Sequence, residues 1–207
     1  MSNAKDRGTC WRRLRVESGI GVVMGSMVIL AAAATLASVS GKQTVPARKP
    51  MVALASPRVV VLKNRRILHL FDGDKLVQSY PIDLGAAPLG PKRHEGDGRT
   101  PIGAFRVVTK NADSRYHRFI GLDYPDLGTV EWGLAHGLIS TGEAASIRRA
   151  LETGRCPDWG TALGGGIGIH GQRIGRDWTG GCVAVSDEHV EELSSVLRIG
   201  DPVEILP

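Results

Sequence analysis

A cysteine and a histidine stand close together in a glycine-rich stretch of this 207-residue chain. His170 ends a short apolar run, and Cys182 follows twelve positions later, directly after two glycines. A thiol with an ordinary pKa of about 8.5 is a weak nucleophile at neutral pH and needs a neighbouring base. An imidazole can take the thiol proton or stabilise the thiolate, and then return a proton to a leaving amine. The pattern predicts nucleophilic acyl transfer, with Cys182 as nucleophile and His170 as base.

The glycines before the cysteine fit the same chemistry. Because they carry no side chain, they allow a reacting acyl group to approach and let successive N–H groups point at a developing oxyanion. Two structural explanations of Cys182 stay open: a small buried apolar residue, or a disulfide with Cys156.

Four residues between the histidine and the cysteine are candidates for substrate binding. Arg173 or Arg176 could hold a substrate carboxylate through two parallel hydrogen bonds, or could belong to a solvated loop face. Trp178 could wall the pocket or fill the core. Thr179 could hydrogen-bond the loop that carries the cysteine, or only stabilise a turn.

Other kinds of site find little support. The histidines lack H-E-x-x-H spacing, the cysteines lack C-x-x-C spacing, and the GGGIG run at 164–168 lacks a following GK[ST], so we expect no metal and no cofactor. The formal net charge is +5, but no cluster of Lys and Arg with interleaved aromatics lies after the first 40 residues. We therefore expect no nucleic-acid partner.

A long uncharged segment lies near the start of the chain. Ser18 to Gly41 are 24 consecutive uncharged residues, preceded by several arginines. About 20 apolar residues span a bilayer, and the preceding arginines predict a cytoplasmic N-terminus. We expect residues 1–41 to form a cytoplasmic N-terminus and membrane anchor, with a cleaved signal segment as the alternative. The rest would be periplasmic or extracytoplasmic, attached to the inner membrane: a linker at 42–56 and one domain at 57–207.

The domain pattern is rich in strands. Short apolar runs, turn residues and a long loop at 85–103 predict a β-rich α+β fold whose first three strands form an antiparallel meander. The expected strands are 58–62, 67–71, 75–84, 104–109, 119–123, 167–170, 183–185 and 203–206. The expected helical regions are 126–155, interrupted by glycines at 137–142, and a helix from N-cap Ser186 to about 197.

Three ordered motifs resemble the L,D-transpeptidase (YkuD-type) catalytic domain. They are IHG at 169–171, DWTGGCVAVSDEHVEEL at 177–193 and HEGDGRTPIGAF at 94–105, and the likeness runs from about Arg58 to Pro207. The resemblance implies a β-sandwich-like fold with a few short helices. It also places the polar loop around Asp97 beside the active cleft, although Asp97-Gly98 is otherwise an ordinary turn signal.

The resemblance also implies roles for single residues. Cys182 would be the nucleophile, His170 the base, and Gly171 the residue whose carbonyl orients the imidazole. The amides of Gly181 and Cys182 would form the oxyanion hole, with Gly180 as a further candidate. For His117, which follows a tyrosine as in the same branch of the family, we expect a buried, hydrogen-bonded side chain.

The implied substrates are peptidoglycan stem peptides, as donor and amine acceptor. The cysteine would attack the carbonyl of the third residue, a diamino acid, expel the terminal D-alanine and pass the acyl group to an amine, in cell-wall cross-linking, remodelling and cell shape. The chain departs from many members at Gly180, where they have His, and at Ala184, where they have Arg or Asn, so the acceptor stays open. A peptidoglycan L,D-peptidase or amidase using water at the same Cys-His site, and a noncatalytic wall-binding module, are the alternatives.

Overall fold

The computed structural model describes residues 53–207 of the chain. The expected membrane segment and residues 42–52 of the expected linker lie outside these residues. Within residues 53–207, no helix combines the length and apolar character needed to cross a bilayer.

The first three strands form the expected meander. They are β1 (Pro57–Leu62), β2 (Ile67–Asp72) and β3 (Lys75–Pro81). β1 pairs antiparallel with β2, and β2 with β3, so that alternate residues such as Val61 and Leu70 are buried on one face. β3 ends at Pro81 and not at Leu84, because Asp83 leaves the meander to bridge Ala184 at the opposite edge of the sheet.

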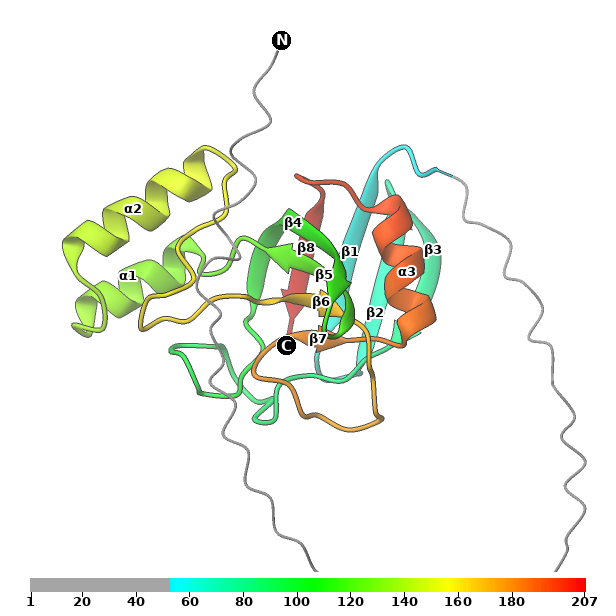
Figure 1. Ribbon diagram of the computed structural model, residues 1–207, viewed down its shortest axis with the longest axis horizontal. Coiled ribbons are helices and arrows are strands. Elements are labelled where there is room, and N and C mark those ends of the chain that lie inside the picture. Colours follow the sequence, from blue (N-terminus) through cyan, green and yellow to red (C-terminus); the bar gives the residue numbers. More distant parts are fainter. Residues whose placement is uncertain (1–52) are drawn as a thin grey trace, which may run out of the picture. The chain divides into compact units, whose positions relative to one another are not determined.

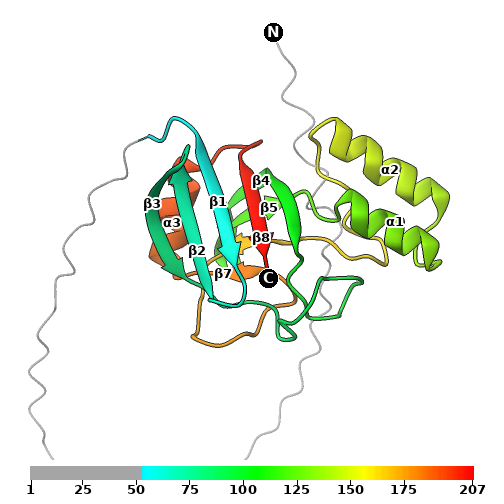
Figure 2. The ribbon, with the colours of Figure 1, turned by 180° about the vertical axis from the view of Figure 1, so that it is seen from behind.

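The sheet continues through strands distant in sequence. β8 (Pro202–Leu206) lies parallel to β1 and antiparallel to β4 (Gly103–Ser114), and β4 also pairs antiparallel with β5 (His117–Leu122). The β4 residues Gly103 to Arg106 pair with β8. Further along β4, the pairing with β5 shifts register between Val107 and Thr109 and again between Asn111 and Ser114. The result is one curled sheet, not the two separate sheets of a sandwich (Figures 1 and 2).

Two short strands complete the far edge. β6 (Gly168–His170) pairs antiparallel with β5 and parallel with β7 (Val183–Ala184). The strand order is β3-β2-β1-β8-β4-β5-β6-β7. His170 therefore ends β6, and Cys182 directly precedes the edge strand β7.

The helix α3 (Asp187–Val196) packs against β5 and β6. The Ser186 hydroxyl accepts the His189 amide and caps the helix as expected, and Asp187 and Glu188 follow in the first turn, where carboxylates suit the helix dipole. The buried face of α3 joins the main apolar core, whose α3 members are Val190, Leu193 and Val196.

A helical hairpin interrupts the strands between β5 and β6. It consists of α1 (Leu127–Ala135), capped by Asp126, and α2 (Thr141–Glu152), where Ser140 and Glu143 form a capping box. The helices separate where the glycines predicted a break, and Gly137 adopts a positive φ of 67°. Figure 1 shows the hairpin at one side of the sheet. It has its own small core of five buried residues: Val130, Ile139, Ala144, Ile147 and Leu163.

Candidate active site

The pairing of β6 with β7 places the two candidate residues, His170 and Cys182, on neighbouring segments of the sheet. In the parallel pairing of β6 with β7, Ile169 lies opposite Val183 and His170 opposite Ala184. Extending this register puts Cys182 opposite Gly168, two positions from the partner of His170. Since side chains alternate along a strand, His170 and Cys182 lie on the same face at diagonal positions of neighbouring strands.

His170 is buried and oriented by its backbone neighbour. Its side chain is 1% exposed, and Nδ1 lies 2.7 Å from the Gly171 carbonyl oxygen. A carbonyl can only accept, so Nδ1 carries the proton and Nε2 is the basic nitrogen. Burial lowers the pKa of His170, the hydrogen bond to Gly171 opposes this, and the charge of Arg115 lowers it further. A neutral imidazole of this tautomer is suited to receive a proton.

Aromatic rings hold the imidazole on two sides. The Tyr116 ring stacks on the His170 ring with centroids 4.6 Å apart, and the Trp178 ring meets it edge-on at 5.8 Å. The Arg115 guanidinium lies 4.6 Å from the Tyr116 ring centroid and donates to the Tyr116 hydroxyl at 2.6 Å. Trp178 thus borders the site. Tyr116 lies in the turn between β4 and β5, and nothing in the sequence pattern predicted its contact with His170.

Cys182 is a free thiol, so the alternative of a disulfide with Cys156 is wrong. Its Sγ donates to the Gly166 carbonyl oxygen at 3.4 Å. Burial raises the pKa of Cys182 to about 11, while a backbone hydrogen bond at Gly168 and the charge of Lys92 act in the opposite direction. At neutral pH the resting pair is therefore thiol and neutral imidazole, which favours proton transfer to His170 over a preformed thiolate.

Thr179 holds the backbone of Gly181 and Cys182. Gly181 has a φ of 139°, and a Cβ there would lie 2.6 Å from the Arg99 carbonyl oxygen, so the position requires glycine. The Thr179 hydroxyl accepts the Gly181 amide at 3.1 Å and donates to the Cys182 carbonyl at 2.7 Å. Thr179 is 4% exposed, which favours the loop-bonding role over direct substrate contact. The Gly181 amide, expected in the oxyanion hole, is engaged with Thr179, whereas Gly180 is exposed with open space around it.

The two arginines of the loop differ in their surroundings. Arg173 Nε lies 3.3 Å from Asp83 Oδ1, and the other oxygen of that carboxylate accepts the amides of Ile174 and Gly175. Asp83 is 2% exposed and so anchors the loop. Arg176 lies on the exposed part of the loop.

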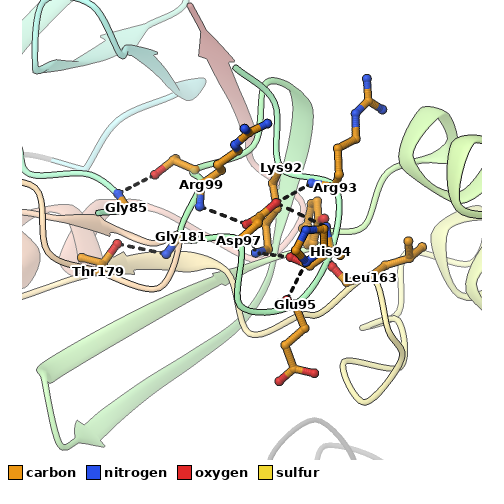
Figure 3. Close-up of polar contacts among 12 residues, drawn as sticks. Gly85, Lys92, Arg93, His94, Glu95, Asp97, Arg99, Leu163, Thr179 and Gly181 are labelled. Atoms are coloured by element: carbon orange, nitrogen blue, oxygen red, sulfur yellow. Dashed lines mark hydrogen bonds and ion pairs between the residues drawn. The ribbon is translucent and has the colours of Figure 1, made fainter. Parts of the chain in front are cut away.

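A second buried carboxylate group lies in the loop at 85–103. Asp97 accepts the amides of Arg93 and Arg99 and contacts the Lys92 ammonium at 2.8 Å (Figure 3). Although burial acts to raise it, these hydrogen bonds hold the pKa of Asp97 below its ordinary value. The loop lies beside the cysteine, as expected, because the Arg99 carbonyl packs on Gly181.

Two buried lysines were missed by the sequence reasoning. Lys63 and Lys92 are each 3% exposed. Lys63 donates to the carbonyls of Thr100 and Gly90 at 2.6 and 2.8 Å, and Lys92 to the carbonyl of His94 at 3.0 Å. Burial, with the charges of Arg66 and Arg99, lowers the pKa of Lys63 to about 8.

The expected burial of His117 is wrong. Its side chain is 37% exposed, and Nε2 lies 2.8 Å from a carboxylate oxygen of Glu191. The hydrogen-bonded part of the expectation is confirmed. Among residues 53–207, no three or more His, Cys, Asp or Glu side chains are grouped to hold a metal ion.

This chain is similar to curated proteins and to solved structures. Over 122 residues, 52% of this chain and 48% of the relative, it is 30% identical to the Escherichia coli K12 protein named "Putative L,D-transpeptidase YafK". The chain therefore spans about half the length of this curated relative.

Among solved structures, the helical cell shape determining protein Pgp2 (K307A mutant) of Campylobacter jejuni is similar, with a TM-score of 0.50, 22% identity and coverage of 72% of this chain and 46% of that chain. An L,D-transpeptidase of Xylanimonas cellulosilytica is also matched, with a TM-score of 0.43, 17% identity and coverage of 77% and 64%. The likeness to Pgp2 supports the fold.

The family model described as the L,D-transpeptidase catalytic domain, YkuD, matches residues 56–205. This match covers most of the chain and nearly all of the described residues. The chain belongs to the L,D-transpeptidase (YkuD) catalytic domain family.

Proposed function

We propose that this protein is a cysteine-dependent L,D-transpeptidase that transfers acyl groups between peptidoglycan stem peptides. At the level of the family, membership supports peptidoglycan cross-linking. The observation that carries the proposal is the tautomer of His170: its Nδ1 is bound to the Gly171 carbonyl, so its basic Nε2 is left for the thiol of the neighbouring strand.

The first half-reaction forms a thioester. His170 Nε2 takes the Cys182 proton while Sγ attacks the carbonyl carbon of the third stem residue. The tetrahedral intermediate collapses as the bond to the terminal D-alanine breaks, and the imidazolium gives its proton to the leaving amine. The acyl group is then held on Cys182 and His170 is neutral again.

The second half-reaction returns the enzyme to its starting state. The acceptor amine attacks the thioester carbonyl and loses a proton to His170 Nε2. The carbon–sulfur bond breaks, and the imidazolium protonates the departing thiolate. Charge and protons balance over the two halves, and a depressed His170 pKa keeps the base neutral for each attack.

The oxyanion of both intermediates needs N–H donors. The Cys182 amide and the amide of exposed Gly180 are candidates, and the Gly181 amide could join them after leaving the Thr179 hydroxyl. Arg176, on the exposed part of the loop, is the better placed of the two arginines to meet a substrate carboxylate, since Arg173 is bound to Asp83.

The test uses the purified full chain with muropeptides that carry tetrapeptide stems. Mass spectrometry is expected to detect cross-linked dimers together with free D-alanine, and Cys182→Ala should give neither. Shortened stems without dimers would show that water accepts the acyl group, so that the enzyme is a peptidase and not a transpeptidase. Unchanged muropeptides with the wild-type chain would contradict both enzymes and leave the wall-binding module.

We also propose that the catalytic domain acts outside the cytoplasm, anchored through residues 1–41, because peptidoglycan lies beyond the inner membrane. The support is the uncharged segment from Ser18 to Gly41 behind several arginines. Externally added protease should degrade the domain in spheroplasts. Protection of the domain until the membrane is dissolved would contradict this location.

A further inference from the structure

Lys92 belongs to a buried ion pair that the acyl-transfer steps do not use. The Lys92 and Asp97 side chains are 3% and 6% exposed, and Nζ lies 2.8 Å from Asp97 Oδ1. Burying an ammonium and a carboxylate is costly, and such a pair is often no more stabilising than apolar residues of the same size. Stability alone is therefore a weak explanation for this pair.

The loop that carries the pair contacts the two backbone segments that border the cysteine. On one side, the Arg99 carbonyl packs on Gly181, next to Cys182 in the chain. On the other side, the Glu95 amide donates to the Ala162 carbonyl at 2.9 Å, and the backbone of Glu95 packs on Gly164. Gly166, two residues further, supplies the carbonyl that accepts the Cys182 thiol. Figure 3 shows Lys92 and Asp97 in the loop that runs past Gly181.

The ammonium is held in one orientation. An ammonium has three N–H donors. The His94 carbonyl and Asp97 accept two of them, while Asp97 itself is fixed by the amides of Arg93 and Arg99. A charge held this way is preorganised, and it keeps its position when the charge on a neighbouring sulfur changes.

We propose that Lys92, fixed by Asp97, is a positioning residue whose buried positive charge stabilises the anionic form of Cys182 at the moment His170 takes the proton. The proposal rests on the proposed function for its catalytic meaning. The proposed effect itself, stabilisation of the Cys182 thiolate by the Lys92 ammonium, can be measured without any substrate.

The electrostatic surroundings agree with this assignment. The charge of Lys92 acts to lower the pKa of the Cys182 thiol against the effect of burial. His170 lies on the neighbouring strand β6, and Asp97 partly offsets the Lys92 charge from within the same loop. Lys63, Arg66 and Arg99 are further cations near this loop, since Arg66 and Arg99 both act on Lys63.

Lys63 provides a matched control. It is as buried as Lys92 and also holds the backbone of the 85–103 loop, through Gly90 and Thr100. Removing Lys63 loosens the loop in the same way without removing the charge at Lys92. The two lysines therefore separate a structural effect from an electrostatic one.

The experiment measures the rate of Cys182 alkylation by iodoacetamide in the full chain, resolved from the other cysteines by peptide mass spectrometry, between pH 6 and 9. Because a thiol reacts as thiolate, its rate below the pKa reports the pKa directly. Lys92→Met is expected to raise the thiol pKa by about one unit, which lowers the rate about tenfold at each pH. Lys92→Arg and Lys63→Met should stay within about threefold of the wild type.

An unchanged alkylation rate in Lys92→Met, or an equal loss in Lys63→Met, would overturn the proposal and leave Lys92 a structural residue. Circular dichroism checks the fold of each variant. If Lys92→Met does not fold, Lys92→Gln, which keeps an N–H donor toward Asp97 without the charge, is judged by the same criterion. A wild-type chain that forms no cross-links but shows the Lys92 effect would reject the proposed function and not this inference.

Discussion

The two apolar cores of residues 53–207 differ in what they support. The larger core fills the curled sheet and α3 and continues under the candidate site through Ile169, Val183 and Val185. The smaller core lies between α1 and α2. It reaches the site through the segment after Leu163, where the Gly166 carbonyl accepts a hydrogen bond from the Cys182 thiol.

The two cores therefore support different parts of the candidate site. The large core fixes the register of β6 and β7, on which the alignment of His170 with Cys182 depends. The hairpin core holds a backbone segment that borders the thiol. Changes in the large core should therefore affect stability and the reacting pair together, whereas changes in the hairpin core should be more local.

The largest expected effect concerns His170, the proposed base, whose strand β6 packs into the large core. His170→Ala should lower the rate of cross-link formation by about 10²–10⁴-fold, because general-base catalysis contributes about that much. The matched control is His117→Ala, which removes an exposed histidine bound to Glu191 and should leave the rate within about twofold. Steady-state kinetics measures both rates. Similar losses in the two variants would contradict a specific role for His170 in the reaction.

A buried residue of the large core tests the stability of the sheet. Ile205 in β8 is fully buried between β1 and β4. Ile205→Ala should lower the free energy of unfolding by about 4 kcal/mol, because removed methylenes leave a cavity in a tightly packed core. Urea denaturation measures the loss. A loss below about 1 kcal/mol would contradict a large contribution of this core to the free energy of unfolding.

The same change in the hairpin core is expected to cost less. Ile147 in α2 is also fully buried, but in a cluster of five buried residues. Ile147→Ala should cost about 2 kcal/mol, at the low end for this change, because a small cluster at the side of the sheet can collapse around the cavity. Hydrogen exchange should accelerate in α1 and α2 and stay unchanged in β1 and β8; equal acceleration in all four would make the two cores one cooperative unit.

A smaller effect concerns the pH dependence of the base. Burial, with help from Arg115, lowers the pKa of His170, so kcat/KM should rise with pH through a value below the ordinary histidine pKa of about 6.5. Arg115→Gln removes a positive charge and should move this acid limb upward by a few tenths of a unit, since Arg115 is exposed to screening solvent. Arg115→Lys should keep the limb in place, and a downward move in Arg115→Gln would contradict the assignment of the limb to His170.

The smallest effect concerns Lys63. Its pKa is about 8 in the folded protein, against an ordinary value of 10.5, so between these pH values the unfolded chain binds the extra proton. The contribution of Lys63 to the free energy of unfolding should therefore rise with pH over this range. Denaturation at pH 7.5 and pH 9.5 should show a growing difference between wild type and Lys63→Met; a constant difference would contradict the lowered pKa.

Local patterns predicted much of the fold. The short apolar runs of β1 and β2, their antiparallel meander with β3 and the cap at Ser186 can be recognised within a few residues of sequence, and the structure has each of them. The insertion of β8 between β1 and β4 joins segments that no local pattern connects, so it was not predicted.

The site divides in the same way. The spacing of His170 and Cys182 predicted both as candidates, and the family motifs supplied the roles expected for their neighbours. The burial of Lys63 and Lys92 was not predicted, because lysines in a glycine-rich loop or beside a turn usually face solvent. The stack of Tyr116 on His170 depends on the β4–β5 pairing, which only the folded chain supplies.

The central claim is that Cys182 carries the acyl group, and intact-protein mass spectrometry tests it most directly. After brief mixing of the full chain with a tetrapeptide-stem muropeptide and quenching in acid, we predict a mass increase equal to the donor without its terminal D-alanine. Peptide mapping should place this adduct on Cys182, and hydroxylamine should remove it. Cross-linked product formed with no adduct, or with an adduct on another residue, would contradict the account.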